Sequence, residues 1–165
     1  IIEVLYGTGI RVSELIELKL SNIFFKENIL KVTGKGNKER FVPLGKIALI
    51  EIKKYLNNRD KLKINSKFSD ILFLNRYGRQ LTRSMIFKVI NDSSKNAEID
   101  KKISPHTLRH SYATHLLKNG ADLRTIQLIL GHESITTTEI YTHLDTFHLE
   151  DVLKKYHPRE NKNQD

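Results

Sequence analysis

Apolar residues recur along this chain with two different spacings, which divide it into helices and a short β-rich stretch. Residues 1–6 and 11–18 carry them at helical intervals, and Gly7-Thr8-Gly9 separates the two segments. An alternating spacing follows in three short runs, at residues 23–25, 29–33 and 39–43. A Lys26-Glu27-Asn28 turn joins the first two runs, and a glycine-containing loop, residues 34–38, joins the last two. The pattern predicts a small three-stranded antiparallel sheet.

Helical spacing returns at Gly45 and continues through the rest of the chain. The predicted helices span residues 45–61, 81–97, 105–118, 123–130, 134–143 and 147–156. Ser104 and Pro105 predict a helix start, because serine caps exposed N–H groups and proline suits the first helical position. Asp122 can cap the following helix, which is expected to end at Gly131. The predicted fold class is mainly α (α+β), a helical domain with a small three-stranded antiparallel sheet.

The composition is that of one soluble domain. The 165 residues are enough for a hydrophobic core, with 39% hydrophobic and 28% charged residues. No apolar run approaches the roughly 20 residues needed to span a bilayer, so no membrane anchor is expected. The chain has no cysteine, which excludes disulfides and thiolate metal sites and favours a cytoplasmic location.

The two ends of the chain predict how it is organised. It opens on Ile1-Ile2-Glu3 without a methionine, like the middle of a helix, so we expect a fragment of a longer protein. We assign residues 1–158 to one domain and expect residues 159–165 to form a disordered tail.

The formal net charge is +9, with a pI near 9.7. An excess of this size favours a polyanionic partner such as nucleic acid. A lysine-rich coding bias without functional meaning would give the same number. Charge alone does not separate the two explanations.

His106 and Arg109 lie one turn apart near the start of a predicted helix. A helix N-terminus attracts anions, and an arginine there adds a planar fork that fits two phosphate oxygens. A histidine can exchange protons near neutral pH. His110 follows Arg109 directly and points elsewhere, so we interpret it as structural.

A metal site is the alternative for these histidines, because His106 and His110 have the i, i+4 spacing of a zinc-binding helix. However, Thr107 stands where zinc proteases of this kind carry a glutamate, and no distal ligand set is evident. Carboxylates are not clustered in a way that would hold magnesium. No metal and no cofactor are predicted.

Tyr141 would by frequency alone be a packing residue with a satisfied hydroxyl. As a nucleophile it would need help, because the phenol pKa is about 10. Without a metal, fixed cations must meet the charge that develops on a phosphate, and Arg11, Arg109 and Lys35 are the candidates. Arg11 and Glu14 share a helix face, which taken alone predicts only a surface ion pair.

Five motifs together resemble the catalytic domain of the tyrosine recombinases, the phage-integrase family, and in particular its Xer-type branch. They are Gly7-Thr8-Gly9-Ile10-Arg11-Val12-Ser13-Glu14-Leu15, Gly34-Lys35-Gly36-Asn37-Lys38-Glu39-Arg40, His106-Thr107-Leu108-Arg109-His110, Leu130-Gly131-His132-Glu133-Ser134 and Tyr141-Thr142-His143. They occur in family order and cover most of the chain. The closing His157-Pro158-Arg159 also resembles the end of Xer-type proteins.

The resemblance implies a role for each matching residue. Tyr141 would attack a DNA phosphate and form a 3′-phosphotyrosine bond. Arg11 and Arg109 would hold the non-bridging oxygens, and Lys35 would protonate the leaving 5′ oxygen. His106 would handle the tyrosine proton.

Two further residues have supporting roles by the same resemblance. His132 would hydrogen-bond the phosphate, and Glu14 would position its neighbours without touching the DNA. A 5′-hydroxyl of another strand would then reverse the attack, which gives strand exchange instead of hydrolysis.

The implied partner is double-stranded DNA at a specific recombination site. The resemblance further implies a tetramer on DNA, assembled through the C-terminal helix at residues 147–156, although that helix could instead fold back on its own core. Residues 1–158 would be the catalytic domain, without the N-terminal domain that clamps DNA. Chromosome dimer resolution is the expected process. The alternatives are integration of a mobile element, a DNA strand-passing or topoisomerase-like activity with the same chemistry, and a DNA-binding regulator that lacks catalysis.

Overall fold

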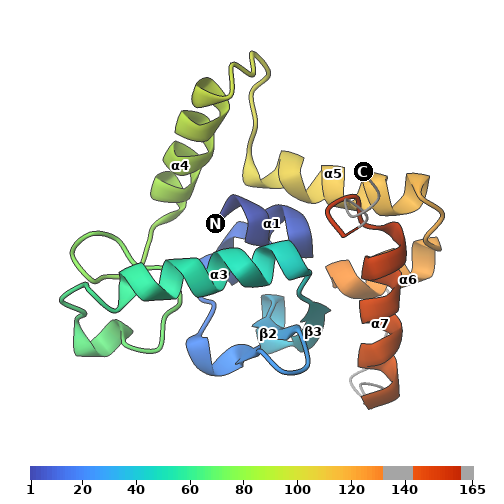
Figure 1. Ribbon diagram of the computed structural model, residues 1–165, viewed down its shortest axis with the longest axis horizontal. Helices are drawn as coiled ribbons and strands as arrows, with labels where there is room; N and C mark the ends of the chain where they lie inside the picture. The colour runs from blue at the N-terminus through green and yellow to red at the C-terminus, as the bar shows by residue number, and fades with distance from the viewer. Residues whose placement is uncertain (132–142, 161–165) are drawn as a thin grey trace.

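The computed structural model describes residues 1–131 and 143–160 (Figure 1). Its helices are α1 (Ile2–Thr8), α2 (Val12–Ile16), α3 (Lys46–Arg59), α4 (Arg83–Asn96), α5 (Pro105–Lys118), α6 (Leu123–Leu130) and α7 (His143–Tyr156). Its strands are β1 (Ile23–Phe24), β2 (Ile29–Thr33) and β3 (Glu39–Pro43). Short 3-10 turns occur at η1 (Leu20–Asn22), η2 (Lys35–Asn37) and η3 (Ser66–Phe68). The predicted mixture of many helices and one small sheet is confirmed.

The three strands form one antiparallel sheet in the order β1-β2-β3. In its β2–β3 register, Leu30 pairs with Val42, and Val32 pairs with Arg40. Because side chains alternate between the faces of a strand, these four share one face, and all four are buried. Arg40 thus occupies an inward position where an apolar residue would be usual.

Local sequence signals set the ends of several helices. Ser104 caps α5 by accepting the N–H of Thr107, and Asp122 caps α6 by accepting the N–H of Thr125. At the other end, α1 stops at Gly9 and α6 stops at Gly131, both in the left-handed conformation. The carbonyls at these two helix ends lack a partner in their own helix, so they can accept other donors.

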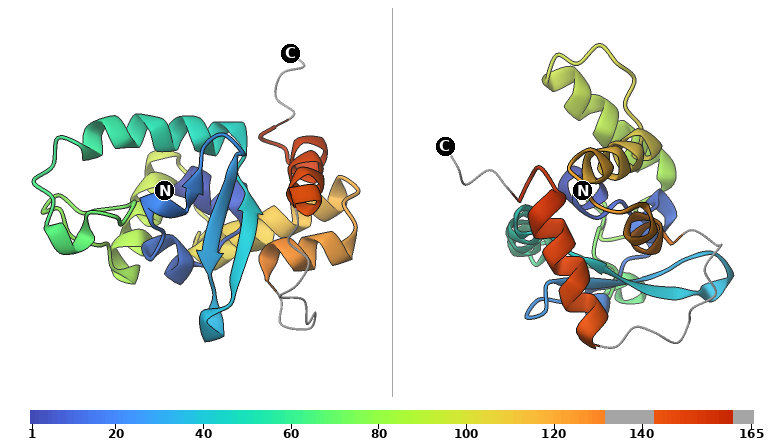
Figure 2. Two further views of the ribbon diagram at one scale, coloured as in Figure 1. Left: turned by 90° about the horizontal axis from the view of Figure 1, so that it is seen from below. Right: turned by 90° about the vertical axis from the view of Figure 1, so that its right-hand side faces the viewer.

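Helix α1 lies at the centre of the molecule, packed against α3 and α5 (Figure 1). Its Leu5 is fully buried, as is Tyr112 of α5. Helices α6 and α7 pack against β3 at one edge of the sheet, and the β2–β3 hairpin projects beyond the helices (Figure 2). One continuous core joins the helices to the sheet, with members from α1, α2, the sheet, α3, α4, α5, α6 and α7.

The C-terminal helix α7 packs against β3 and α5 of its own chain. Its Leu149, Val152 and Leu153 are all buried there. The helix begins at His143, four residues before the predicted start at Phe147. Most of the helix predicted for residues 134–143 lies outside the described residues.

The described chain continues past the boundary predicted at residue 158. Arg159 donates to the Glu3 carboxylate of α1, and Glu160 lies in the turn that follows α7. Residues 159 and 160 are thus among the described residues, and the predicted boundary at residue 158 stays a prediction. Residues 161–165 are not among the described residues. None of the described helices is long and apolar enough to cross a membrane.

Candidate active site

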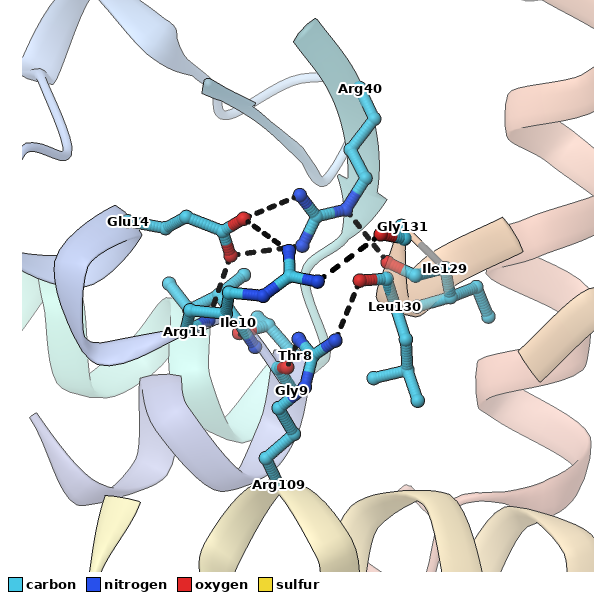
Figure 3. Close-up of polar contacts among 10 residues, drawn as sticks. All are labelled: Thr8, Gly9, Ile10, Arg11, Glu14, Arg40, Arg109, Ile129, Leu130 and Gly131. Carbon is cyan, nitrogen blue, oxygen red and sulfur yellow. Dashed lines mark hydrogen bonds and ion pairs between the residues drawn. The ribbon is translucent and has the colours of Figure 1, made fainter. Parts of the chain in front are cut away.

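Glu14 of α2 is the centre of the polar cluster in Figure 3. Its side chain is 2% exposed, and its carboxylate accepts four donors. Arg11 supplies its backbone N–H at 2.7 Å and Nη1 at 3.1 Å, and Arg40 supplies Nη1 at 2.7 Å and Nη2 at 2.9 Å. Burial alone would raise the pKa of Glu14. Hydrogen bonds and charge from Arg40, reinforced by those from Arg11, outweigh it and hold the pKa below its ordinary value.

Three arginines meet three consecutive carbonyls at the C-terminal end of α6. Arg40 Nε donates to Ile129 O at 2.9 Å, Arg109 Nη2 to Leu130 O at 2.7 Å, and Arg11 Nη2 to Gly131 O at 3.2 Å. The arginines come from β3, from α5 and from the residue that precedes α2 (Figure 3). The C-terminal end of a helix carries partial negative charge, which favours cations there. The end of α6 therefore gathers the three guanidinium groups in one place.

Arg109 is fixed by carbonyls from two helix ends. In addition to Leu130 O, it donates Nη1 to Gly9 O at 2.5 Å. Burial, followed by the positive charges of Arg11 and Arg40, lowers the pKa of Arg109 to about 10. The group is still charged at neutral pH, but its neighbours make that charge costly, and a bound anion would relieve the cost.

The charges of the cluster do not balance. Arg11, Arg40 and Arg109 bring three positive charges, and Glu14 is the carboxylate that they share. Within the described chain, the contacts of Arg11 and of Arg109 each use two of the five N–H groups of a guanidinium. The Arg11 side chain is 41% exposed, so solvent reaches this edge of the cluster. A phosphate could dock there and accept from both arginines.

The structure brings together three of the residues predicted for the site, namely Arg11, Glu14 and Arg109. His106 is exposed on α5, one turn before Arg109 and on the same helix face. Lys35 lies in η2 at the tip of the β2–β3 hairpin. His132 and Tyr141 lie outside the described residues. Among residues 1–131 and 143–160, no three His, Asp or Glu side chains form a group that could hold a metal ion.

The hairpin that carries Lys35 begins at the cluster. A Cβ atom added to Gly34 would lie 3.4 Å from Glu14 Oε1 and 3.6 Å from Arg40 Nη1. Gly34 therefore lies about one side-chain carbon away from the Glu14–Arg40 pair, and Lys35 is the next residue. Gly131, whose carbonyl accepts from Arg11, directly precedes His132 in the sequence.

Arg40 was not identified as a site residue from the sequence. It is 7% exposed and donates to both oxygens of the Glu14 carboxylate, which also accepts from Arg11. One signal could have found it. Alternation along β3 puts Arg40 on the same face as Val42, and a charged residue at an inward strand position needs a buried partner.

This chain is similar in sequence to curated proteins and to solved structures. XerD tyrosine recombinases of Listeria monocytogenes and Halalkalibacterium halodurans are each 49% identical, over 158 and 159 residues. The matches cover 95% and 96% of this chain and 53% of each relative, so the chain spans about half of their length.

Two structures show the same fold. The crystal structure of XerA recombinase matches with a TM-score of 0.74 and 38% identity, over 95% of this chain and 57% of that one. The crystal structure of XerH recombinase bound to its difH substrate, a pre-cleavage complex, matches with a TM-score of 0.70 and 28% identity. This match covers 91% of this chain and 41% of that one. The model of the phage integrase family matches residues 1–148. With this match and these relatives, the chain belongs to the phage integrase family.

Proposed function

We propose that this chain is the catalytic half of a site-specific tyrosine recombinase that cuts and rejoins double-stranded DNA. The observation that carries the proposal is the cluster in which Arg11 and Arg109, fixed by helix-end carbonyls, keep N–H groups for an anion. The net charge of +9 suits a DNA partner. The relatives named as tyrosine recombinases and the family match support the same activity.

In this mechanism the Tyr141 oxygen attacks phosphorus and displaces the 5′ oxygen of the next nucleotide. One P–O bond forms as another breaks, and the number of phosphodiester bonds is unchanged. The tyrosine proton passes to His106, and the leaving 5′ oxygen takes a proton from Lys35. Attack by a 5′-hydroxyl of another strand then reverses each transfer and releases Tyr141.

Arg11 and Arg109 would stabilise the negative charge that builds up on the non-bridging oxygens. Both guanidiniums are held by acceptors that exist before the substrate arrives, so little reorganisation is needed in the transition state. His132 would add a hydrogen bond to the same phosphate. Glu14 would set the direction of Arg11 without contact with DNA.

Chromosome dimer resolution is the process that we favour. The two XerD relatives named above are 49% identical to this chain, whereas the Tn1549 transposon integrase structures are 24–25% identical to it. We also propose that the protein assembles as a tetramer on DNA through its C-terminal helix. For this, α7 would exchange its contacts with β3 and α5 of its own chain for those of a neighbour.

A nicked suicide substrate tests the activity, because loss of the short 5′ fragment traps the covalent intermediate. The chain should form a DNA adduct that survives denaturing electrophoresis. Tyr141→Phe should abolish the adduct and leave DNA binding intact. Tyr77→Phe is the matched control, because Tyr77 is 64% exposed but remote from the arginine cluster, and it should form the adduct normally. DNA binding without any adduct would instead indicate a regulator.

A further inference from the structure

We propose that Arg40 is a positioning residue that holds the Lys35 hairpin in register with the phosphate-binding arginines. This proposal rests on the function proposed above. Arg40 belongs to the hairpin itself, since it lies in β3 and pairs with Val32 of β2. Its contacts lead away from the hairpin to two other elements of the site.

The Arg40 guanidinium uses three of its five N–H groups, one on each nitrogen, to donate to the protein. It donates hydrogen bonds to both carboxylate oxygens of Glu14 on α2 and to the Ile129 carbonyl on α6. Its side chain is 8% exposed, compared with 41% for Arg11. A buried group with its donors engaged in this way has no role as a phosphate ligand. Instead, it joins three elements that are distant in the sequence.

Each of the joined elements leads to a residue of the proposed reaction. On α2, Glu14 holds Arg11. On α6, the two carbonyls after Ile129 hold Arg109 and Arg11. On the hairpin, Gly34 lies beside Arg40 and Glu14, close enough that an added Cβ would contact both, and its N–H donates to Lys38 O at 2.7 Å, which closes the loop around Lys35.

The consequence is specific to one step of the chemistry. If Arg40 is lost, the hairpin loses its bidentate attachment to Glu14, and the Lys35 backbone is no longer fixed relative to the phosphate site. Arg11 and Arg109 keep their own carbonyl acceptors. Protonation of the leaving oxygen should therefore suffer more than stabilisation of the phosphate charge.

Arg40→Lys is the test variant, because lysine cannot reproduce a bidentate contact plus a third donor. Adduct formation is measured in single turnover on two nicked substrates, one with the normal 5′ oxygen and one with sulfur at that bridging position. A thiolate leaves without a proton. Arg40→Lys should slow adduct formation on the oxygen substrate by about 100-fold. On the sulfur substrate its rate should return to near that of the wild type. Lys35→Ala should show the same pattern. Arg11→Lys should slow both substrates alike.

Arg59→Lys is the matched control for burial. Arg59 is 4% exposed and donates to the carbonyls of Ser69, Ile71 and Leu72, remote from the cluster. It should lose thermal stability as Arg40→Lys does, yet react at the wild-type rate once folded. Equal slowing of Arg40→Lys on both substrates, or a wild-type rate, would overturn the proposal.

A second variant, Gly34→Val, keeps the test decisive if Arg40→Lys folds poorly, and hydrogen exchange tests a folded Arg40→Lys without any reaction. Gly34→Val retains Arg40 but pushes the hairpin off the Glu14–Arg40 pair, so it should show the same oxygen-specific loss. Hydrogen exchange without DNA should be faster at the amides of residues 34–38 in Arg40→Lys, and unchanged in Arg59→Lys. Unchanged exchange in the hairpin would refute the positioning role independently of any reaction, whereas absence of a wild-type adduct would refute the proposed function.

Discussion

Replacing Glu14 by glutamine keeps the shape of the side chain but removes the charge at the centre of the cluster. The carboxylate accepts four donors, two from Arg11 and two from Arg40. The amide oxygen of glutamine can keep two of them, and its NH2 group then faces the other two donors. Arg40 becomes a buried charge without a carboxylate. We expect a loss of about 3–5 kcal/mol in the free energy of unfolding, the range for breaking a buried ion pair.

That loss is large against the roughly 5–15 kcal/mol that stabilises a typical domain. At about 2–4 °C for each kcal/mol, it corresponds to a fall in melting temperature of about 6–20 °C. The assay is urea unfolding followed by far-UV circular dichroism, which suits a chain without tryptophan. Glu51→Gln is the control, because Glu51 makes an exposed ion pair with Lys54, and it should leave the melting temperature unchanged.

The pH dependence gives a second check on Glu14. Its pKa in the folded protein lies below the ordinary value of 4.5, so its contribution is complete above that pH and is lost as pH falls through the folded pKa. The stability gap between wild type and Glu14→Gln should therefore shrink in acid. A gap under about 1 kcal/mol at neutral pH, or one that does not change in acid, would refute the reasoning.

Two further predictions concern single residues. Gly131 has φ +66° and a Cβ there would lie 3.0 Å from Arg40 Cδ and Nε, so Gly131→Ala should cost more than the roughly 1–2 kcal/mol of left-handed strain alone. Gly36→Ala has the same strain at φ +72° with nothing within 4 Å, and equal melting temperatures for the two variants would contradict this. Burial lowers the pKa of His157 from 6.5 to about 4, so wild-type stability should fall by about 3 kcal/mol as pH drops through that window. His157→Phe should abolish this part of the pH dependence in urea titrations, and an unchanged slope would refute it.

Much of the fold followed from local patterns in the sequence. Residues 39–43 were predicted as a strand and form β3 with the same bounds, because alternation and flanking turn residues act over a few positions. The Ser104 cap and the Gly131 stop also depend on neighbouring backbone groups only. The start of α7 was less predictable, since Asp145 and Thr146 look like capping residues but the helix begins before them.

The candidate site was only partly accessible to sequence reasoning. The motifs identified Arg11, Glu14 and Arg109, and the structure places the three together. Arg40 was missed, because alternation along β3 predicts that its side chain points inward but does not identify its buried partner, Glu14, which is 26 residues away in the sequence. The catalytic role of Tyr141 is a prediction that the adduct experiment tests, and the role of His132 stays a prediction.

The sequence alone determined where helices and strands form and which residue types are present for phosphate chemistry, since both depend on short-range patterns. Tertiary structure decided which of these residues meet. Arginine side chains donate to carbonyls that are far away in the sequence: Arg109 to Gly9 over 100 residues, Arg11 to Gly131 over 120 and Arg40 to Ile129 over 89. Such contacts form because hydrophobic burial packs α6 against α5 and β3, and the end of α6 then offers three carbonyls to the guanidinium groups that packing has placed there.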